Sequence, residues 1–315
     1  MADITCLGIL VADLVGKPVD KYPERGKLVL VDQLELHSGG CAANTGVALA
    51  KIGIDTALIG KVGCDGLGDF MVSALERNGV SAEGIVRDTK VGTSGTMVVV
   101  HSDGERDFIH YLGANATLVE DDINWDLIKG SKILHIAGSF LMPAFDGQPT
   151  ANVLKKAQEM GIITSLDTCW DSKGQWMKVL EPCLQYMDYA VPSIEEARMV
   201  TGQHDPADVA KVFMDYGVKV VGLKMGEKGS YIRTADTEIT IPRFTVNAID
   251  ALGAGDSFAA GFLTGILKGW DLEKTGRFAN AVGACCVKAL GATTGIKTLD
   301  ETLTLMDEWT AEIVG

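Results

Sequence analysis

Several features that would assign a sequence to a familiar class are missing from this one. The seven cysteines are odd in number and scattered, and they include no Cys-x-x-Cys pair of the zinc or thioredoxin type. No uninterrupted apolar segment approaches the roughly 20 residues that cross a bilayer. No basic stretch precedes the early apolar run, which Asp13 interrupts, so we expect no signal peptide. We therefore expect reduced cysteines and a cytoplasmic protein.

Basic residues are also scarce. The chain has 28 Lys and Arg against 42 Asp and Glu, a formal charge of −14. Such a negative surface repels nucleic acids and anionic membranes, and we expect neither as a partner. An anionic ligand would need local positive potential from backbone N–H groups, a helix N-terminus, a lysine or a metal ion.

Three common site motifs are absent. No Gly-x-Gly-x-x-Gly follows the first predicted strand, which argues against a dinucleotide-dependent dehydrogenase. Segment 291–298 is not a P-loop, because Ile296 stands directly before Lys297 where the motif needs glycine. The five histidines lie far apart, without the spacing of metal ligands, and we assign His37 and His110 to a small sheet rather than to a catalytic triad.

Short apolar runs alternate with helical patterns along most of the 315 residues. This rhythm is typical of βαβ units in a mainly parallel sheet covered on both faces. The predicted strands are 4–11, 56–59, 132–137, 162–166, 189–191 and 219–224. Predicted helices that end before a glycine are 41–52, 69–78 and 152–160. Because no repeat or linker divides the chain, we expect one α/β domain over residues 1–315.

Two stretches, 16–37 and 91–111, break this rhythm. Both alternate with the two-residue period of exposed antiparallel strands. In the second stretch, Ser102-Asp103-Gly104 joins 96–101 to 106–111 like a hairpin turn. We expect a small β-sheet that acts as a lid, formed by about residues 13–38 and 91–112. A pair of surface loops is the alternative.

The most informative segment runs from Asn247 to Asp256 and ends where an amphipathic helix is predicted over 256–268, followed by a second helix over 273–289. Small residues at Gly253, Ala254 and Gly255 let backbone N–H groups converge, forming an anion site without a basic side chain. A transferring phosphoryl group would fit there, and the Asp256 carboxylate could accept the proton of an attacking hydroxyl. An ordinary helix N-cap is the structural alternative.

Asp250-Ala-Leu-Gly-Ala-Gly-Asp256 resembles the D-T-x-G-A-G-D signature of the ribokinase (PfkB) family of carbohydrate kinases, with Ala251 in place of the usual Thr. Ser38-Gly-Gly-Cys-Ala-Ala-Asn44 resembles the family's G-G-x-x-x-N signature. Further matches follow in family order at 62–68, 113–115, 224–229 and 278–281. The resemblance implies a ribokinase-like three-layer αβα fold with a small β-sheet lid, and an ATP-dependent sugar kinase.

The resemblance also implies substrate-binding residues. Gly39 and Gly40 would let a ligand approach the backbone closely, and Asn44 would offer donors and an acceptor to sugar hydroxyls. Asp13 matches a carboxylate that grips two sugar hydroxyls in the family. Arg106 resembles an arginine that some members direct at the substrate, and a solvated hairpin charge is the alternative.

For the nucleotide, the resemblance implies that Gly226 and Gly229 lie near the ATP phosphates and ribose, together with Ser193 and Lys224. Asn280 matches a position that lines the adenine pocket. ATP is thus the expected cosubstrate.

Two metal sites are implied as well. Glu196 matches the acid of the family's N-x-x-E motif, which holds Mg²⁺ through water, although Ser193 replaces the Asn. Asp250, with the carbonyl groups of Leu252 and Gly291, would hold a monovalent cation. Because Ala251 and Gly295 differ from the commoner residues, K⁺ activation is a hypothesis.

A kinase of a neutral sugar, like ribokinase or fructokinase, is our first hypothesis. Lys27 lies where sugar-phosphate kinases of the family carry a phosphate-binding lysine, so a phosphofructokinase-like activity is the first alternative. A nucleoside kinase follows, since no aromatic cluster in the predicted lid indicates a base. A silent sugar or nucleotide sensor is favoured by Ser193 and Ala251 and opposed by the intact turn 253–256. Apolar edges at 28–31 and 97–100 predict a homodimer through the lid.

Overall fold

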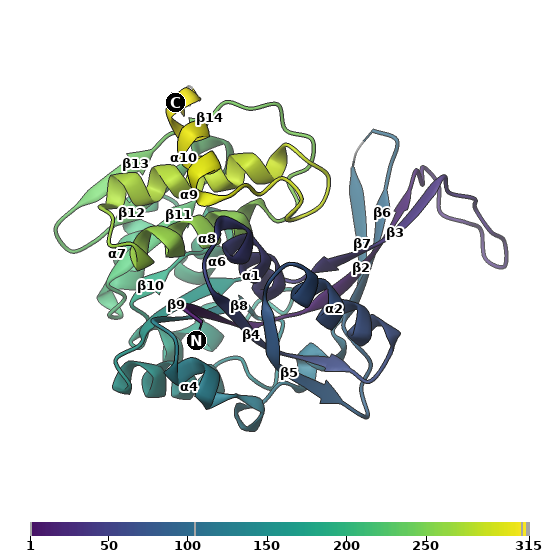
Figure 1. Ribbon diagram of the computed structural model, residues 1–315, viewed down its shortest axis with the longest axis horizontal. Coiled ribbons are helices and arrows are strands. Elements are labelled where there is room, and N and C mark those ends of the chain that lie inside the picture. The colour runs from purple at the N-terminus through teal and green to yellow at the C-terminus, as the bar shows by residue number, and fades with distance from the viewer. Residues whose placement is uncertain (1, 104, 310, 313–315) are drawn as a thin grey trace.

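Within the described residues, nine strands form the central sheet (Figure 1). The computed structural model describes residues 2–103, 105–309 and 311–312, so Met1 and Gly104 of the expectations above lie outside the described residues. The strand order is β13-β12-β11-β10-β9-β8-β1-β4-β5. Their bounds are β1 Ile4–Gly8, β4 Thr56–Gly63, β5 Ser81–Asp88, β8 Ile133–Ser139, β9 Ile163–Thr168, β10 Tyr189–Ala190, β11 Val220–Lys224, β12 Ser230–Arg233 and β13 Glu238–Ile241. Neighbours from β5 to β11 are parallel, whereas β12 and β13 pair antiparallel.

Helices cover both faces of this sheet. Successive residues of a strand point to opposite faces, so Cys6 and Leu58 belong to one buried cluster while Leu7 and Ile59 belong to the other. The first cluster includes side chains of α1 Cys41–Ile52, α2 Gly66–Arg77, α8 Ala254–Leu267, α9 Leu272–Val287 and α10 Leu299–Glu308. The second includes side chains of α3 Trp125–Lys129, α4 Gln148–Glu159, α5 Met177–Leu184, α6 Ile194–Thr201 and α7 Pro206–Asp215. The predicted three-layer αβα fold with a mainly parallel sheet is confirmed.

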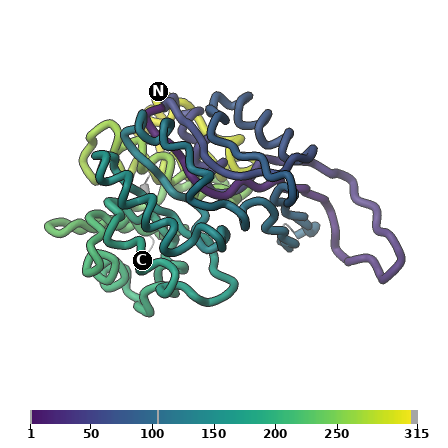
Figure 2. Tube along the Cα trace, turned by 90° about the horizontal axis from the view of Figure 1, so that it is seen from below, coloured from purple at the N-terminus to yellow at the C-terminus, as the bar shows by residue number. Residues whose placement is uncertain are grey.

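A second, four-stranded sheet has the order β3-β2-β6-β7 and stands to one side of the main body (Figure 1). Its strands are β2 Val11–Lys17, β3 Gln33–Gly39, β6 Gly95–Val100 and β7 Arg106–Tyr111. β2 pairs parallel with β6, and the other pairs are antiparallel, including the β6–β7 hairpin that the sequence predicted. The violet segment between β2 and β3 extends furthest from the main body (Figure 2).

Two strand predictions were wrong in part. Residues 4–11 do not form one strand, because β1 ends at Gly8 and Val11 already belongs to the small sheet. A Cβ on Gly8 would come within 1.9 Å of the Ala137 carbonyl oxygen, so this crossing between the two sheets requires glycine. In the stretch 16–37, residues 18–32 form neither strand nor helix, and Pro18 has no N–H to donate to a neighbouring strand.

The remaining elements are short. β14 Arg243–Phe244 pairs antiparallel with β15 Ala311–Glu312. Three 3₁₀ turns are η1 Gly113–Thr117, η2 Glu120–Asp122 and η3 Gly226–Lys228. Among the helices in the described parts of the chain, none is both long and apolar enough to cross a bilayer.

Candidate active site

The start of α8 is set by a glycine turn. The helix begins at Ala254, two residues before the predicted start, and its N-cap Gly253 adopts a left-handed φ of 75°. A Cβ on Gly253 would come within 2.5 Å of Ala292 oxygen, so both the conformation and the space require glycine. The first amides of a helix have no partner within the helix, and the helix dipole adds positive potential there. Gly255 and Asp256 therefore present N–H groups suited to an anion.

The two glycine-rich signatures meet at Asp256. The side-chain amide of Asn44 on α1 donates to the Asp256 carboxylate at 2.8 Å, across 212 residues of sequence. α1 begins directly after Gly40, whose φ is 93° and where a Cβ would lie 2.5 Å from Ile9 oxygen. The tight turn at Gly40 thus brings the first turn of α1 against the first turn of α8.

Burial raises the pKa of Asp256 above its ordinary value. Hydrogen bonds from Asn44 and Cys41 and the charge of Lys224 oppose this shift, while Glu196 adds to it. A raised pKa makes a carboxylate a better proton acceptor, which is the property that a general base needs.

Asp13 and Gly39 are also in contact. A Cβ on Gly39 would lie 2.0 Å from an Asp13 carboxylate oxygen, so the carboxylate occupies the space that a side chain would fill. Burial raises the pKa of Asp13 to about 6, while Thr96 and His37 lower it. In the small sheet Asp13 is the register partner of both His37 and Thr96, and Thr96 is the partner of His110. This polar row was not predicted, because strand pairing cannot be read from one sequence.

Lys224 is paired rather than free. Its ammonium group donates to both carboxylate oxygens of Asp167, at 2.8 and 2.6 Å. Burial alone would lower the pKa of Lys224, but the charges of Asp167, Glu196 and Asp256 outweigh it and raise the pKa. A Cβ on Gly255 would lie 3.4 Å from the Lys224 nitrogen, so the ammonium group lies just behind the α8 turn.

Asp167 was not predicted as a site residue from the sequence. It lies near the carboxyl end of β9, and the carboxyl ends of parallel strands are where ligands bind in open α/β sheets. That position was the available signal.

Ser193 and Glu196 form a capping box at the start of α6, in which each side chain accepts from the other residue's backbone N–H. Glu196 also accepts a hydrogen bond from the Thr168 hydroxyl at 2.9 Å. Asp167, Glu196 and Asp256 thus place three carboxylates around the one ammonium group of Lys224. This negative excess suits a divalent cation bound together with polyphosphate.

One cavity of about 580 Å³ joins most of these groups, a size typical of small-molecule sites. Predicted residues that line it are Ser193, Glu196, Lys224, Gly226, Gly229, Gly253, Ala254, Gly255, Asp256 and Asn280. Asp13, Gly39 and Gly40 do not line it, but Cys41 and the Asn44–Asp256 contact connect them to its edge.

The positions predicted for the nucleotide also carry structural bonds. The Asn280 amide donates to the carbonyl oxygens of Ile241 and Pro242, at 3.2 and 2.9 Å. Gly229 has a φ of 82°, and a Cβ there would lie 2.1 Å from Ile241 oxygen. Gly226, with a φ of 58°, faces open space. The loop from Gly226 to Gly229 is therefore shaped by its glycines and open to a ligand.

The residues predicted for a monovalent cation lie together, but Asp250 already has partners. Its carboxylate accepts from the backbone N–H groups of Leu252 and Gly291, both at 2.8 Å. It also pairs with Arg106 of the small sheet at 2.8 Å. Arg106 is therefore not a solvated hairpin charge, and its predicted contact with the substrate would have to coexist with this ion pair.

An aromatic group at the cavity was not predicted. Trp170 lines the cavity, is 54% exposed, and packs edge-on against Trp176, which in turn packs against Phe140. Both Trp176 and Phe140 have positive φ values, 34° and 83°. Such strained residues persist where the surrounding structure holds them, often at functional sites. These aromatic residues lie outside the predicted lid, and no sequence motif marks them.

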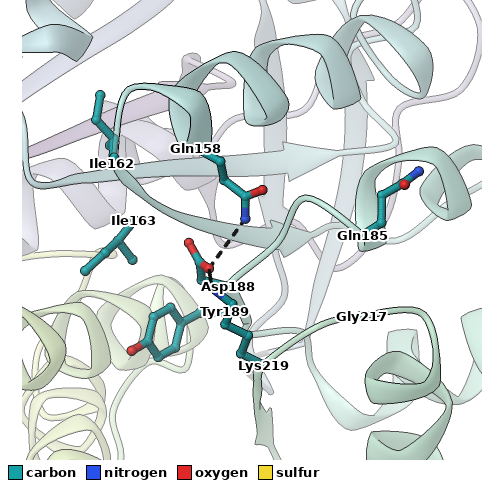
Figure 3. Close-up of a pocket in the computed structure, with 9 residues that line it drawn as sticks. Gln158, Ile162, Ile163, Gln185, Asp188, Tyr189, Gly217 and Lys219 are labelled. Atoms are coloured by element: carbon teal, nitrogen blue, oxygen red, sulfur yellow. Dashed lines mark hydrogen bonds and ion pairs between the residues drawn. The ribbon is translucent and has the colours of Figure 1, made fainter.

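A second hollow of about 520 Å³ lies at the other ends of the strands (Figure 3). Asp188 at its centre contacts Gln158 and forms an ion pair with Lys219 at 2.6 Å. The same carboxylate accepts from the Thr164 backbone and hydroxyl, so its oxygens are occupied by protein donors. Asp188 therefore joins neighbouring strands, and the chemistry of the molecule gathers at the α8 cavity instead.

Comparison with known proteins agrees with this geometry. The pfkB family of carbohydrate kinases matches residues 1–299. Fructokinase-2 of Oryza sativa subsp. japonica is 31% identical over 83% of this chain and 82% of that protein. The structure of ribokinase from Thermotoga maritima superposes with a TM-score of 0.84 at 26% identity, covering 98% of this chain and all of the other. A sugar kinase of Pyrococcus horikoshii, solved in complex with ATP, gives 0.77 at 30% identity, covering 96% and 97% of the two chains. The chain therefore belongs to the pfkB family of carbohydrate kinases.

Proposed function

We propose that this carbohydrate kinase transfers the γ-phosphoryl group of ATP to a hydroxyl of a neutral sugar, with Asp256 as the proton acceptor. The observation that carries the proposal is the start of α8, where the Asp256 carboxylate and backbone amides share one helical turn and Asn44 contacts the carboxylate at 2.8 Å. ATP is supported by the ATP complex of the Pyrococcus horikoshii relative, and a neutral sugar by the names of the rice and Thermotoga relatives.

The chemistry follows from these groups. Asp13 and Asn44 would accept from and donate to the sugar hydroxyls and so orient one of them toward the cavity. The oxygen of that sugar hydroxyl attacks the γ-phosphorus of ATP. The hydroxyl proton passes to the Asp256 carboxylate, and ADP leaves. The amides of Gly255 and Asp256 would stabilise the charge on the transferring phosphoryl group, because the helix start holds them in place before the reaction.

Magnesium fits the same cleft. Glu196 would hold the ion through water, with Ser193 beside it, and the ion would offset phosphate charge next to three carboxylates. Among the described residues, no group of three or more His, Cys, Asp or Glu side chains is placed to hold a metal ion directly. The hydrogen bond that the Thr168 hydroxyl donates to Glu196, 2.9 Å long, would hold the Glu196 carboxylate in position for the water molecules around the ion.

We also propose a monovalent cation near Asp250, bound with carbonyl oxygens of Leu252 and Gly291. The ion would have to share the Asp250 carboxylate with Arg106, which pairs with it at 2.8 Å. Activity in K⁺ should therefore exceed activity in a large organic cation, and Arg106→Ala should enlarge the difference. Equal rates in both salts, in both proteins, would remove the cation site.

A neutral sugar is favoured over a sugar phosphate by the location of Lys27. Lys27 lies on the exposed segment 18–32 and forms an ion pair with Glu24. Its positive charge is therefore already partly balanced by a carboxylate outside the cleft. The small sheet gives no comparable support for a nucleoside substrate, because the row of register partners that includes Asp13 is polar.

The experiment is a turnover assay with ATP and a panel of pentoses, hexoses, their phosphates and nucleosides, in which ADP and the phosphorylated product are both measured. We expect phosphorylation of one or a few neutral sugars. Binding of a sugar without product would favour the sensor, and turnover only with a sugar phosphate would favour the phosphofructokinase-like alternative.

We propose a homodimer that forms through the small sheet. Four exposed apolar side chains, Leu36, Leu14, Met97 and Ile109, are register partners across its four strands. The two predicted edges were wrong as edges, because residues 28–31 lie outside the strands and β6 lies between β2 and β7. An exposed apolar face is a comparable liability in a monomer. Light scattering should give twice the chain mass at working concentrations.

Finally, we propose a cytoplasmic location. The seven cysteines are odd in number and scattered along the chain, which favours reduced cysteines rather than a disulfide framework. Cell fractionation with a cytoplasmic marker would test this.

A further inference from the structure

Two thiols meet inside the active-site cavity. The sulfur atoms of Cys41 and Cys169 are 3.3 Å apart although the residues are separated by 128 positions in the sequence. Both residues line the cavity that also contains Asp256. A disulfide is about 2.05 Å long, so the two sulfur atoms need to approach by only a little over 1 Å to form one.

The other five cysteines differ from this pair. Cys6, Cys183, Cys285 and Cys286 are buried, and the thiols of Cys183 and Cys286 contact backbone carbonyl oxygens. Cys64 is exposed and does not line the cavity. Only Cys41 and Cys169, among the described cysteines, have thiol-to-thiol contact within the cavity.

We propose that Cys41 and Cys169 are an oxidation site, at which hydrogen peroxide oxidises the two thiols to a disulfide across the catalytic cleft and stops phosphoryl transfer. The Cys41 sulfur, as thiolate, attacks one peroxide oxygen, giving a sulfenic acid while the other oxygen leaves as water after protonation. The Cys169 sulfur then attacks the sulfenic sulfur, the S–S bond forms and the hydroxyl leaves as a second water. Two thiols lose two electrons and two protons, and one hydrogen peroxide becomes two waters.

The location explains why the bond would stop the reaction. Cys41 is the first residue of α1, directly after Gly40, and its thiol lies within hydrogen-bonding reach of the Asp256 carboxylate. Cys169 follows Thr168, which holds Glu196. A disulfide would draw the Cys41 sulfur away from the Asp256 carboxylate. It would also link the start of α1, beside the proposed sugar site, to the residue after β9, beside the proposed magnesium site. The carboxylate and the phosphoryl group could then no longer align.

The charges of the cleft set the pH dependence of this oxidation. The hydrogen bond with Cys169, burial and the charge of Asp256 raise the pKa of Cys41 well above its ordinary value. The hydrogen bond with Cys41 lowers the pKa of Cys169. Burial and the carboxylates of Glu196, Asp256 and Asp167 outweigh that bond, so the pKa of Cys169 is raised. Both thiols are therefore protonated at neutral pH, and because the thiolate is the nucleophile, oxidation should become faster as pH rises.

The test uses the full-length protein, reduced and then exposed to hydrogen peroxide at several pH values. Mass spectrometry of the digested, unreduced protein should show the Cys41 and Cys169 peptides joined, with the loss of two hydrogen atoms. Kinase activity should fall in step with this product and return on adding dithiothreitol. Cys169→Ser should keep the activity that it has before treatment, whereas Cys64→Ser, the control at an exposed cysteine, should be inactivated like the natural protein.

Two results would overturn the proposal. One is an unreduced digest in which Cys41 and Cys169 stay unlinked while Cys64 is oxidised. The other is inactivation that proceeds equally in Cys169→Ser. The peptide linkage is measured without any sugar or ATP, so its absence is distinguishable from a failure to find the sugar substrate.

Discussion

The main body and the small sheet contribute different residues to the proposed active site. The main body supplies Asp256 and the backbone amides of α8, fixed by a glycine turn in which a Cβ would meet Ala292 at 2.5 Å. The small sheet supplies Asp13 and Gly39 from two strands that stand away from the main core (Figure 1). We infer a division between the two parts: the main body supplies the groups that take part in phosphoryl transfer, and the small sheet supplies groups that bind the sugar.

The small sheet itself has two unlike faces. Asp13, His37, Thr96 and His110 form one polar row of register partners, and Asp13 and Thr96 are buried. In the adjacent row of register partners, Leu36, Leu14, Met97 and Ile109 point the other way and are exposed. The period of two in a strand allows one sheet to bind a polar ligand and a second protein surface at once.

Replacing the proposed base should give the largest effect and test the chemical half of this division. Asp256→Asn keeps the shape but cannot take a proton, so kcat should fall by about 10²–10⁴ while the KM for sugar changes little. Steady-state kinetics measure both. Asp236→Asn, at an exposed turn residue, is the matched control and should behave like the natural protein. An unchanged kcat in Asp256→Asn would remove Asp256 from its role.

Filling the space at Gly39 should test the binding half. In Gly39→Ala the new methyl group would lie 2.0 Å from the Asp13 carboxylate and displace it. Overpacking of this kind costs about 1–3 kcal/mol, which we expect to appear as weaker sugar binding with ATP affinity retained. Isothermal calorimetry with each ligand distinguishes the two. Gly66→Ala has open space around it and should have no effect, and equal losses for sugar and ATP would contradict the division.

Acid should weaken sugar binding through Asp13. Burial raises the pKa of Asp13 to about 6, so the carboxylate is ionised above that pH and protonated below it. Because the ionised form is the better acceptor for hydroxyls, sugar affinity should be lost as pH falls, by about tenfold per unit well below the pKa. Titrations of sugar binding from neutral to acidic pH measure this. Asp13→Asn should bind weakly with little pH dependence, and a natural protein without pH dependence would contradict the assignment.

Charging the apolar face of the small sheet should give the smallest effect on turnover. Met97→Lys places an ammonium group in the middle of the exposed row, which should prevent the proposed dimer and halve the mass seen by light scattering. The polar row faces the other way, so kcat should stay nearly constant. Met199→Lys, at an exposed methionine of α6, is the control and should keep the dimer mass. A monomeric natural protein would refute the dimer.

Much of the fold was predictable because its signals are local. The predicted helix 41–52 matches α1 at both ends, since Gly40 and Gly53, both with positive φ values, bound it. The predicted strand 4–11 was wrong because the turn at Gly8 depends on Ala137, more than a hundred residues away. Segment 18–32 alternates in polarity like a strand, but it forms none. It bonds to neighbouring strands near its two ends, where Val19 N–H donates to Val100 oxygen and Asp32 N–H to Lys17 oxygen.

The candidate site was predictable only where its residues belong to a compact motif. Gly253 to Asp256 and Gly39 to Asn44 are each contiguous, so their chemistry could be read along the chain. Asp167 and Trp170 belong to no compact motif. Apart from the place of Asp167 near the end of a strand, what distinguishes them is their contact with Lys224, Trp176 and the cavity.

The sequence by itself determined the alternation of strands and helices, the glycine turns that start α1 and α8, and the acidic character of the chain. Backbone propensities and glycine conformations act over a few residues, so they are already present in the order of amino acids. The tertiary structure decided which side chains meet: Asn44 with Asp256, Arg106 with Asp250, and Cys41 with Cys169. These contacts form only when parallel strands align their carboxyl ends, because side-chain interactions depend on distance in space and not on separation along the chain.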